Sequence, residues 1–158
     1  TTPWTLPSNL GLAVHRDADY VRVKEKTGTQ EYILAKALWK NPFGKEAEKN
    51  FEILEEMKGA ALLGWKYEPL FPFFAEKEKE GAFKVIHSDH VTMDSGVGIV
   101  HMAPAFGEED YAACQKNGIP LVNPVDDDGM FTSAVGPYAG RRVKEADKDL
   151  IAEIKAKG

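Results

Sequence analysis

The sequence predicts a mixed α+β fold with a β-barrel-like core and helices packed around it. Short apolar or alternating runs recur at modest spacing, turn residues separate these runs, and only a few segments show helical periodicity. The length of 158 residues corresponds to one ordinary domain. Many short strands combined with a few helices are typical of a small barrel with helices outside it.

The clearest strand pattern lies near the N-terminus. LGLAV (residues 10–14) predicts a short apolar strand, and YVRVK (20–24) and EYIL (31–34) alternate on either side of a turn containing Gly28, which is typical of a β-hairpin. Further short strands are expected at residues 83–86, 90–93, 98–101 and 121–122, with an extended edge segment at 65–70.

Helical spacing of apolar residues indicates a helix over residues 46–58, where Phe51, Leu54 and Met57 recur among charges and Gly59 follows. Shorter or similar helices are expected at residues 35–39, 108–117 and 143–155. The first nine residues, TTPWTLPSN, contain two prolines and are expected to form an irregular segment.

Composition narrows the class of protein. Hydrophobic residues make up 43% and charged residues 28% of the chain, which favours a folded core over disorder. The net charge of −5 argues against a free-standing nucleic-acid binder, although a local contact with nucleic acid stays open. The single cysteine excludes an internal disulfide, and no Cys/His cluster has the spacing of a zinc site. These features favour a reducing, cytoplasmic setting.

No apolar run reaches the roughly 18 residues of a membrane helix, and there is no signal peptide, so no membrane association is expected. The chain starts with Thr1 and has no initiator Met, and TTPWT has the character of the middle of a motif. The expectation is therefore that residues 1–158 are one domain excised from a larger protein.

Three motifs have ordinary structural interpretations. Gly96-x-Gly98 lacks the third glycine of a dinucleotide-binding turn and precedes its strand, so it indicates a tight turn. Asp126-Asp127-Asp128-Gly129 lacks the ligand alternation and closing glutamate of a calcium loop. Cys114 lies on the apolar side of a predicted helix and is interpreted as a packing residue.

The stretch GVGIVHMAPAFGEEDY (residues 96–111) is the most informative part of the chain. His101 ends an apolar strand, and Asp110 lies in the first turn of the following helix. A core histidine and an acid that complements the helix dipole would explain both residues structurally. Alternatively, both could face one small space with an apolar wall from Phe106 and a floor of the small residues Ala103 and Ala105, where a carboxylate suits the ammonium group of a ligand.

The N-terminal segment offers hydroxyl groups without charge. Thr1, Thr2 and Thr5 cluster beside Trp4, and prolines restrict the backbone around them. The residues by themselves leave a ligand pocket and ordinary loop chemistry equally open. No Ser-His-Asp pattern, nucleophile elbow or reactive-cysteine context indicates a particular reaction.

TTPWTLPSN (1–9) and GVGIVHMAPAFGEEDY (96–111) together closely resemble the two signature segments of the editing (CP1) domain of isoleucyl-tRNA synthetases, of the eukaryote-like type. The resemblance covers essentially the whole chain. Valyl relatives usually carry TTRPET and a lysine at the position of His101, and leucyl relatives carry TTRPDT. The family usually has three consecutive threonines, whereas this chain begins with two.

This resemblance implies the editing-domain fold of class I aminoacyl-tRNA synthetases and hydrolysis of mischarged Val-tRNA(Ile), and also of valyl-adenylate. Isoleucine would be excluded, and a positioned water would attack the aminoacyl ester. The implied enzyme activity is editing within an isoleucine–tRNA ligase, without aminoacylation by these residues alone. No metal and no cofactor are implied for this domain, whereas the parent enzyme uses ATP and Mg²⁺.

The resemblance also implies roles for individual residues. Asp110 matches the acid that holds the α-ammonium group of valine, and His101 matches the residue that lines the side-chain pocket and excludes isoleucine. The candidate catalytic residues are Thr2, Thr5, His101 and Asp110. The candidate substrate-binding residues are Thr1, Thr2, Trp4, Thr5, His101, Ala103, Phe106 and Asp110.

The implied partners are the 3′ CCA end of tRNA(Ile) carrying valine, valyl-adenylate and the rest of the synthetase, with the domain itself monomeric and cytoplasmic. Two alternatives stay open. One is a non-catalytic ligand- or protein-binding β-domain in which His101 and Asp110 are structural, and the other is a free-standing trans-editing deacylase.

Overall fold

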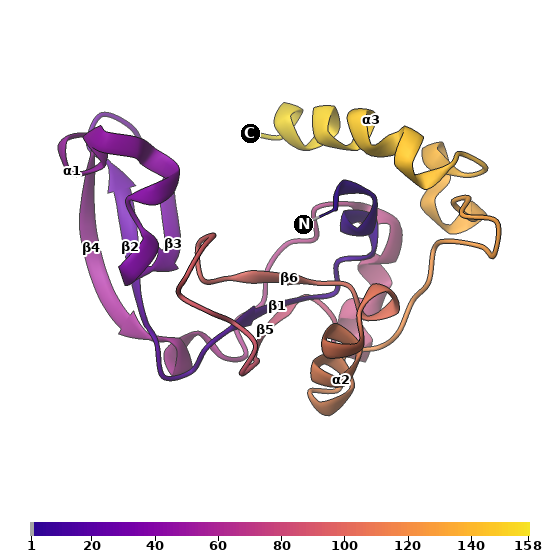
Figure 1. The fold of residues 1–158 in the computed structure, drawn as a ribbon, viewed down its shortest axis with the longest axis horizontal. Helices are drawn as coiled ribbons and strands as arrows, with labels where there is room; N and C mark the ends of the chain where they lie inside the picture. Colours follow the sequence, from indigo (N-terminus) through magenta and orange to yellow (C-terminus); the bar gives the residue numbers. More distant parts are fainter. Residues whose placement is uncertain (1) are drawn as a thin grey trace. The chain divides into compact units, whose positions relative to one another are not determined.

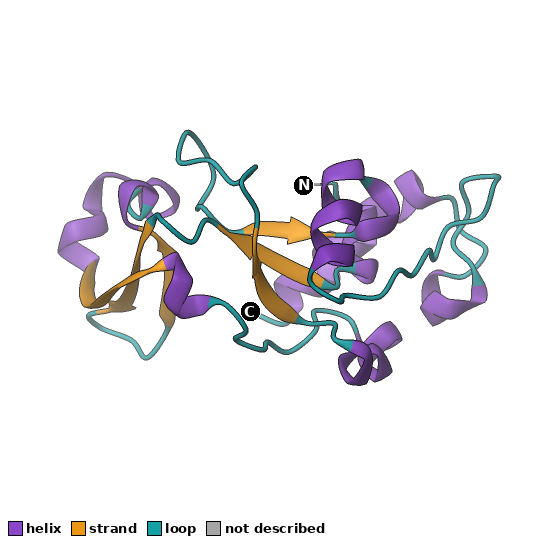
Figure 2. Ribbon diagram, turned by 90° about the horizontal axis from the view of Figure 1, so that it is seen from below, coloured by secondary structure: helices purple, strands orange, loops and turns teal. Residues whose placement is uncertain are grey.

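The computed structural model describes residues 2–158, and within that range it contains two three-stranded sheets, three α-helices and several short 3₁₀ helices. The sheet orders are β5-β1-β6 and β3-β2-β4. Figure 2 shows that short helices and loops make up most of the chain outside these strands. This combination confirms the predicted mixed α+β class.

The chain divides into two compact units. The terminal unit consists of the residues up to Gly11, Lys66–Lys84 and His101–Gly158, and the middle unit consists of Leu12–Trp65 and Val85–Val100. The chain passes from one unit to the other at β1 (Gly11–Val14), between Trp65 and Lys66, at β5 (Lys84–His87) and at β6 (Val100–Met102).

The middle unit is built on a β-hairpin with a third strand beside it (Figure 1). β2 (Asp19–Glu25) pairs antiparallel with β3 (Glu31–Ala35) and with β4 (Phe51–Lys58). The alternation predicted for the hairpin is confirmed. One buried cluster on this sheet and the segment between β3 and β4 consists of Val21, Val23, Leu34, Trp39 and Ala47.

The predicted helix over residues 46–58 is wrong. Only α1 (Ala47–Asn50) is helical, and the chain then continues as β4. Phe51 and Met57 are partly buried, but Leu54 is 41% exposed, so the apparent helical face does not exist in the fold. β2 offers this segment a ladder of backbone hydrogen bonds, and that tertiary partner overrides an ambiguous local pattern.

Two glycines permit close backbone approaches in the middle unit. A Cβ atom on Gly59 would lie 2.0 Å from the carbonyl oxygen of His15, so this glycine permits contact and does not end a helix. Gly98 has a φ of +75°, and a Cβ there would lie 2.5 Å from the Cβ of Ala35. The tight turn expected from Gly96-x-Gly98 is confirmed.

The strands predicted at residues 10–14, 83–86 and 98–101 correspond to β1, β5 and β6. The segments at residues 90–93 and 121–122 are not strands, and in 65–70 only an isolated bridge from Lys66 to Lys84 forms. Near residues 90–93 the backbone forms turn hydrogen bonds instead, such as that from the Val91 N–H to the Ser88 carbonyl oxygen (3.3 Å). In the segment 121–122, Leu121 is 56% exposed.

The terminal unit carries the longer helices. α2 (Glu108–Lys116) and α3 (Val143–Ala156) match their predicted spans, and Val143, Ala146 and Leu150 of α3 are buried. The N-terminal segment is more regular than expected, because Pro3–Ser8 forms the 3₁₀ helix η1 with Pro3 in its first turn.

Six further 3₁₀ helices connect these elements. They are η2 (Lys36–Leu38), η3 (Asn41–Glu46), η4 (Gly59–Leu62), η5 (Pro72–Glu80), η6 (Pro104–Phe106) and η7 (Ser133–Tyr138). In the part of the chain that the structure describes, we find no helix with the length and apolar character needed to span a membrane.

Candidate functional site

The two segments that carry the family resemblance meet in the terminal unit. Thr5 Oγ1 lies 3.0 Å from Nε2 of His101, and Asn9 Nδ2 lies 2.7 Å from Nδ1 of the same ring. The ring of Trp4 packs edge-on against that of Phe106, with 4.9 Å between centroids and 74° between planes. Residues about a hundred positions apart in sequence therefore form one cluster.

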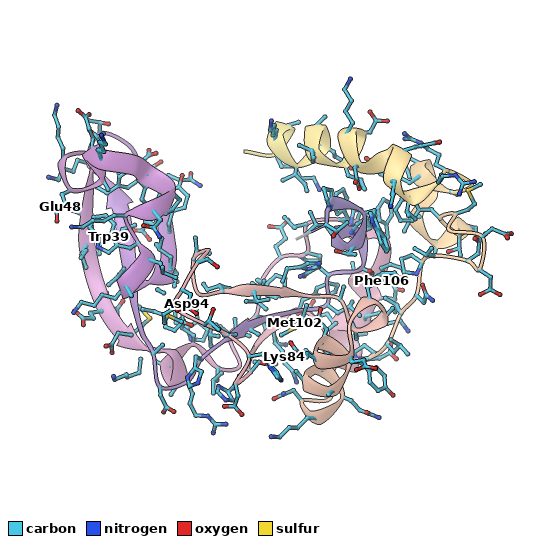
Figure 3. All side chains as sticks on the ribbon, in the orientation of Figure 1. Trp39, Glu48, Lys84, Asp94, Met102 and Phe106 are labelled. Carbon is cyan, nitrogen blue, oxygen red and sulfur yellow. The ribbon has the colours of Figure 1, made fainter. Side chains whose placement is uncertain are left out.

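The strands explain why these segments meet. Asn9 lies two positions before β1, and β1 neighbours β6, which carries His101. The N–H of Leu10 donates to the carbonyl oxygen of Met102 at 3.0 Å and fixes the register at this point. Figure 3 labels Met102 at the end of β6 and Phe106 in the following 3₁₀ turn.

The hydrogen bonds around His101 fix its tautomer. Nδ2 of Asn9 donates to the carbonyl oxygen of Gly11 at 3.0 Å, which only an N–H group can do. Its other N–H then points to Nδ1 of His101, so Nδ1 is the acceptor and the ring proton lies on Nε2. Nε2–H in turn donates to Thr5 Oγ1.

Thr5 completes this chain of donors. Its hydroxyl donates to the carbonyl oxygen of Thr2 at 2.8 Å, so towards His101 the same oxygen acts as acceptor. Thr5 is buried within η1, and its carbonyl oxygen accepts from Ser8 Oγ at 3.1 Å. Each hydrogen-bonding proton in the series from Asn9 through His101 to Thr5 and Thr2 therefore has one consistent position.

Burial lowers the pKa of His101 to about 4, so the ring is uncharged near neutral pH. Because Nδ1 already accepts a hydrogen bond and Nε2 already carries the proton, His101 has no unoccupied lone pair with which to take a proton from water. In this arrangement the ring is an oriented, neutral wall and hydrogen-bond donor, and not a general base.

Asp110 lies in the first turn of α2, and its Oδ2 accepts from the backbone N–H of Ala103 at 3.1 Å. This bond joins the start of the helix to a residue two positions after His101. Burial raises the pKa of the Asp110 carboxyl above its ordinary value. A half-buried carboxylate of this kind gains from a cationic partner, because charge that is partly removed from water is stabilised by an opposite charge.

The remaining candidates differ in accessibility. Thr2 is exposed, Trp4 and Phe106 are partly buried, and Ala103 is buried. Thr1, which was also a candidate, lies outside the described residues. Glu108, which stands beside Asp110 in sequence, is exposed at the start of α2.

An open hollow of about 650 Å³ adjoins the same turn. Its lining residues are Pro104, Ala105, Phe106, Gly107, Glu108, Tyr111, Leu121 and Asn123. Neither His101 nor Asp110 lines this hollow. Phe106 does line it, and the same ring contacts Trp4 beside the cluster around His101.

Two residues of the cluster were missing from the sequence-based candidates. Asn9 is buried and holds His101, and the hydroxyl of Tyr67 donates to Oδ1 of Asn9. Asn9 lies inside the segment TTPWTLPSN, so its position in that motif was an available signal. Tyr67 lies 58 residues further along the chain, and no sequence pattern marks it.

Cys114 is buried in α2, and burial raises the pKa of its thiol to about 12. The thiolate is therefore strongly disfavoured near neutral pH, which agrees with its interpretation as a packing residue. Among residues 2–158, no group of three or more His, Cys, Asp or Glu side chains is arranged to hold a metal ion.

No family model matches the chain, but individual relatives do. It is 61% identical over 158 residues to the isoleucine–tRNA ligase of Bdellovibrio bacteriovorus, a match that covers 100% of this chain and 15% of that protein. It is 52% identical over 156 residues to the cytoplasmic isoleucine–tRNA ligase of Saccharomyces cerevisiae, with 96% of this chain and 15% of the relative covered. The chain thus spans about 15% of the length of these relatives.

Solved structures match the fold at low sequence identity. The crystal structure of GlLeuRS-CP1 superposes with a TM-score of 0.72 at 18% identity, covering 99% of this chain and 78% of that one. The editing domain of the Plasmodium knowlesi cytosolic leucyl-tRNA synthetase gives a TM-score of 0.66 at 14% identity, covering 99% and 79%.

The sequence relatives and the fold agree with the resemblance of the two signature segments. The chain belongs to the isoleucine–tRNA ligase family, and its fold is that of the CP1 editing domains of class I aminoacyl-tRNA synthetases.

Proposed function

We propose that residues 1–158 act as the editing domain of an isoleucine–tRNA ligase and hydrolyse the aminoacyl ester of Val-tRNA(Ile), and also valyl-adenylate, while excluding isoleucine. The observation that carries this proposal is the cluster in which the neutral, fixed ring of His101 is held by Thr5 and Asn9, with Asp110 bonded two residues away at Ala103.

A second site is needed because isoleucine and valine differ by one methylene group. A hydrophobic pocket distinguishes such a pair by only about 1–3 kcal/mol, a limit already established for these two amino acids in this family. A site that admits valine and rejects the larger isoleucine removes the errors that the first site leaves.

Asp110 has the chemistry to bind the α-ammonium group of valine. Oδ2 is engaged by the Ala103 N–H, which fixes the carboxylate, and the second oxygen is then available to accept from the ligand. Because the carboxyl is partly buried, this charge-assisted bond is stronger than one in open water. It orients the ester for attack.

His101 has the properties of the excluding wall. Its ring is held at both nitrogen atoms, so it cannot turn aside to make room for an additional methyl group. Trp4 and Phe106 supply apolar surface beside it. A rigid boundary is what size exclusion requires, because an adaptable wall would accept both amino acids.

In the proposed reaction a water oxygen bonds to the ester carbonyl carbon, and the bond from that carbon to the ribose oxygen breaks. The ribose oxygen leaves with a proton, and valine and tRNA are the products. Hydroxyl groups such as that of Thr2, together with backbone N–H groups, would stabilise the oxyanion. The locked state of His101 leaves proton removal from water to another group.

The proposal includes no metal, cofactor or covalent intermediate in this domain, and it assigns ATP and Mg²⁺ to aminoacylation by the parent enzyme. The partners would be the CCA end of tRNA(Ile) and the rest of the synthetase, in the cytoplasm, with this domain monomeric. A net charge of −5 fits a domain that receives only the end of the tRNA.

The test is deacylation of Val-tRNA(Ile) by the chain and by a full-length isoleucine–tRNA ligase that carries these residues. Asp110→Ala should lower kcat/KM by about 100-fold, because the ammonium group loses its anchor and the ester its orientation. Glu108→Ala is the matched control, since Glu108 is an exposed acid in the same helical turn. It should leave the rate unchanged.

Normal clearance of Val-tRNA(Ile) by the Asp110→Ala enzyme would refute the assigned role. If neither the chain nor the full-length enzyme hydrolyses Val-tRNA(Ile), the non-catalytic ligand-binding alternative replaces the proposal. If the chain alone hydrolyses Val-tRNA(Ile) at full rate and the full-length enzyme does not hydrolyse it, the free-standing deacylase is favoured.

A further inference from the structure

We propose that Tyr67 is a positioning residue, which acts through Asn9 to hold His101 in the tautomer with its proton on Nε2. This inference rests on the proposed editing function for its catalytic consequence. Its structural part, the control of the tautomer, stands on the hydrogen bonds alone.

Asn9 is the link between Tyr67 and His101. It is only 6% exposed, and its amide uses both ends at once. Nδ2 donates to the Gly11 carbonyl oxygen (3.0 Å) and to His101 Nδ1 (2.7 Å), while Oδ1 accepts from the hydroxyl of Tyr67. An amide group is nearly symmetrical in shape, so these partners alone decide which way it faces.

Tyr67 is itself held from several directions. Its backbone N–H donates to the carbonyl oxygen of Phe83 at 3.0 Å, and the two rings pack edge-on with centroids 6.0 Å apart. Burial raises the pKa of the Tyr67 hydroxyl above its ordinary value, so the group stays protonated and can donate.

The backbone that holds Tyr67 is also tied to the segment that carries Asn9. Phe83 has a φ of +63°, a conformation that bulky residues rarely adopt. Its N–H donates to the carbonyl oxygen of Leu10 at 2.7 Å, one residue after Asn9. A backbone conformation of this kind persists only where surrounding contacts hold it. Here the backbone of Phe83 bonds both Tyr67 and Leu10, so it links the segment of Tyr67 to the segment of Asn9.

Removal of the Tyr67 hydroxyl would leave Oδ1 of Asn9 buried without its donor, which favours rotation of the amide. The bond from Nδ2 to the Gly11 carbonyl oxygen opposes that rotation, so a mixture of the two amide orientations is expected. In the reversed amide, Oδ1 would face Nδ1 of His101, and that nitrogen would then need the proton. Nε2 would lose its proton and could no longer donate to Thr5. The hydroxyl of Thr5 would have to turn towards Nε2 and away from the Thr2 carbonyl oxygen.

The first experiment reads the tautomer directly, without any substrate. ¹⁵N NMR of the ring nitrogens of His101 in the chain should give a protonated Nε2 and an unprotonated Nδ1 at pH 7. Tyr67→Phe should shift both signals towards a mixture of tautomers. Tyr138→Phe is the matched control, because the Tyr138 hydroxyl instead bonds Glu153 Oε2 at 2.8 Å, and it should leave both signals unchanged.

The second experiment measures deacylation of Val-tRNA(Ile) and of Ile-tRNA(Ile) in the full-length enzyme. Tyr67→Phe should lower the preference for Val-tRNA(Ile) over Ile-tRNA(Ile) by about 10-fold, because the binding groups remain and only the orientation of the excluding ring of His101 is lost. Since Tyr67 acts through Asn9, the same substitution added to Asn9→Ala should cause no further loss.

Ring signals in Tyr67→Phe that match those of the unsubstituted chain would overturn the proposal, and so would additive losses in the double variant. A shifted tautomer in an enzyme that has no activity on Val-tRNA(Ile) before substitution would support the control by Tyr67 and refute the editing function. The two claims therefore fail separately.

Discussion

A histidine and an aspartate lie near each other in two places in this protein, and the two environments shift the pKa of the carboxyl group in opposite directions. In the terminal unit, His101 bonds only uncharged groups, and the nearby Asp110 bonds a backbone N–H. In the middle unit, His87 Nε2 lies 2.8 Å from Oδ1 of Asp89, whose side chain is 87% exposed.

The carboxyl pKa values record the difference. Burial raises the pKa of Asp110, whereas the hydrogen bond from His87 lowers that of Asp89. Water around Asp89 screens the pair, so the interaction has little effect on stability. The same two residue types therefore form a hydrogen-bonded pair with an exposed carboxylate in one unit and a candidate binding site in the other, because burial and hydrogen-bond partners differ.

The largest contrast should come from removing each histidine. His101→Ala should lower the preference of the enzyme for Val-tRNA(Ile) over Ile-tRNA(Ile) by about 10-fold or more, or abolish hydrolysis, because the excluding wall is lost. Loss of the hydrogen bonds from His101 to Asn9 and Thr5 should also cost about 2 kcal/mol of unfolding free energy. Deacylation assays with both tRNAs and urea unfolding measure these effects.

His87→Ala is the comparison for that experiment, and it should leave the preference between the two tRNAs unchanged. Unaltered selectivity in His101→Ala would remove His101 from the pocket and make the two histidines equivalent.

A pH series should separate the two environments next. The pKa of His101 is lowered from 6.5 to about 4 in the folded protein, so between these values the unfolded chain binds more protons. Stability therefore rises with pH across this window and is lost as the pH falls from about 6.5 to about 4, by at most about 3 kcal/mol. The raised pKa of Asp110 has the opposite sign and reduces the net change.

The measurement is urea unfolding from pH 7 to pH 4, in the unsubstituted protein and in His101→Gln, which cannot titrate. A flatter profile is expected for His101→Gln. Parallel profiles would mean that His101 is solvated and titrates normally.

The smallest effect should come from Asp89→Asn. The lowered pKa of Asp89 gives a contribution that is present above its unfolded value of 3.8 and lost as the pH falls through the folded value. Because Asp89 is exposed, the change in thermal unfolding at pH 7 should be small and should vanish in high salt. A large, salt-independent loss would show that this pair is as structural as the cluster around His101.

Local patterns predicted part of the fold well. The hairpin of β2 and β3 follows from strict alternation around a turn, and α2 and α3 follow from helical spacing, because both signals lie within a few neighbouring residues. β4 was missed, because the spacing of its apolar residues fits both a helix and a strand, and only pairing with β2 decided between the two.

The candidate site divides in the same way. His101 and Asp110 lie in one continuous motif, so the resemblance could select them, although their roles stay predictions. Tyr67 could not be found in this way, because its contact with Asn9 joins positions 58 residues apart and exists only when the chain is folded.

The sequence by itself determined the family, the mixed α+β class and the two segments proposed to carry the site, because identity and local periodicity are properties of residue order. Only the tertiary structure decided that β4 is a strand, that His101 is neutral with its proton on Nε2, and that Asn9 and Tyr67 hold it there. Ladder pairing, burial and proton positions depend on which groups meet, and those groups come from distant parts of the chain.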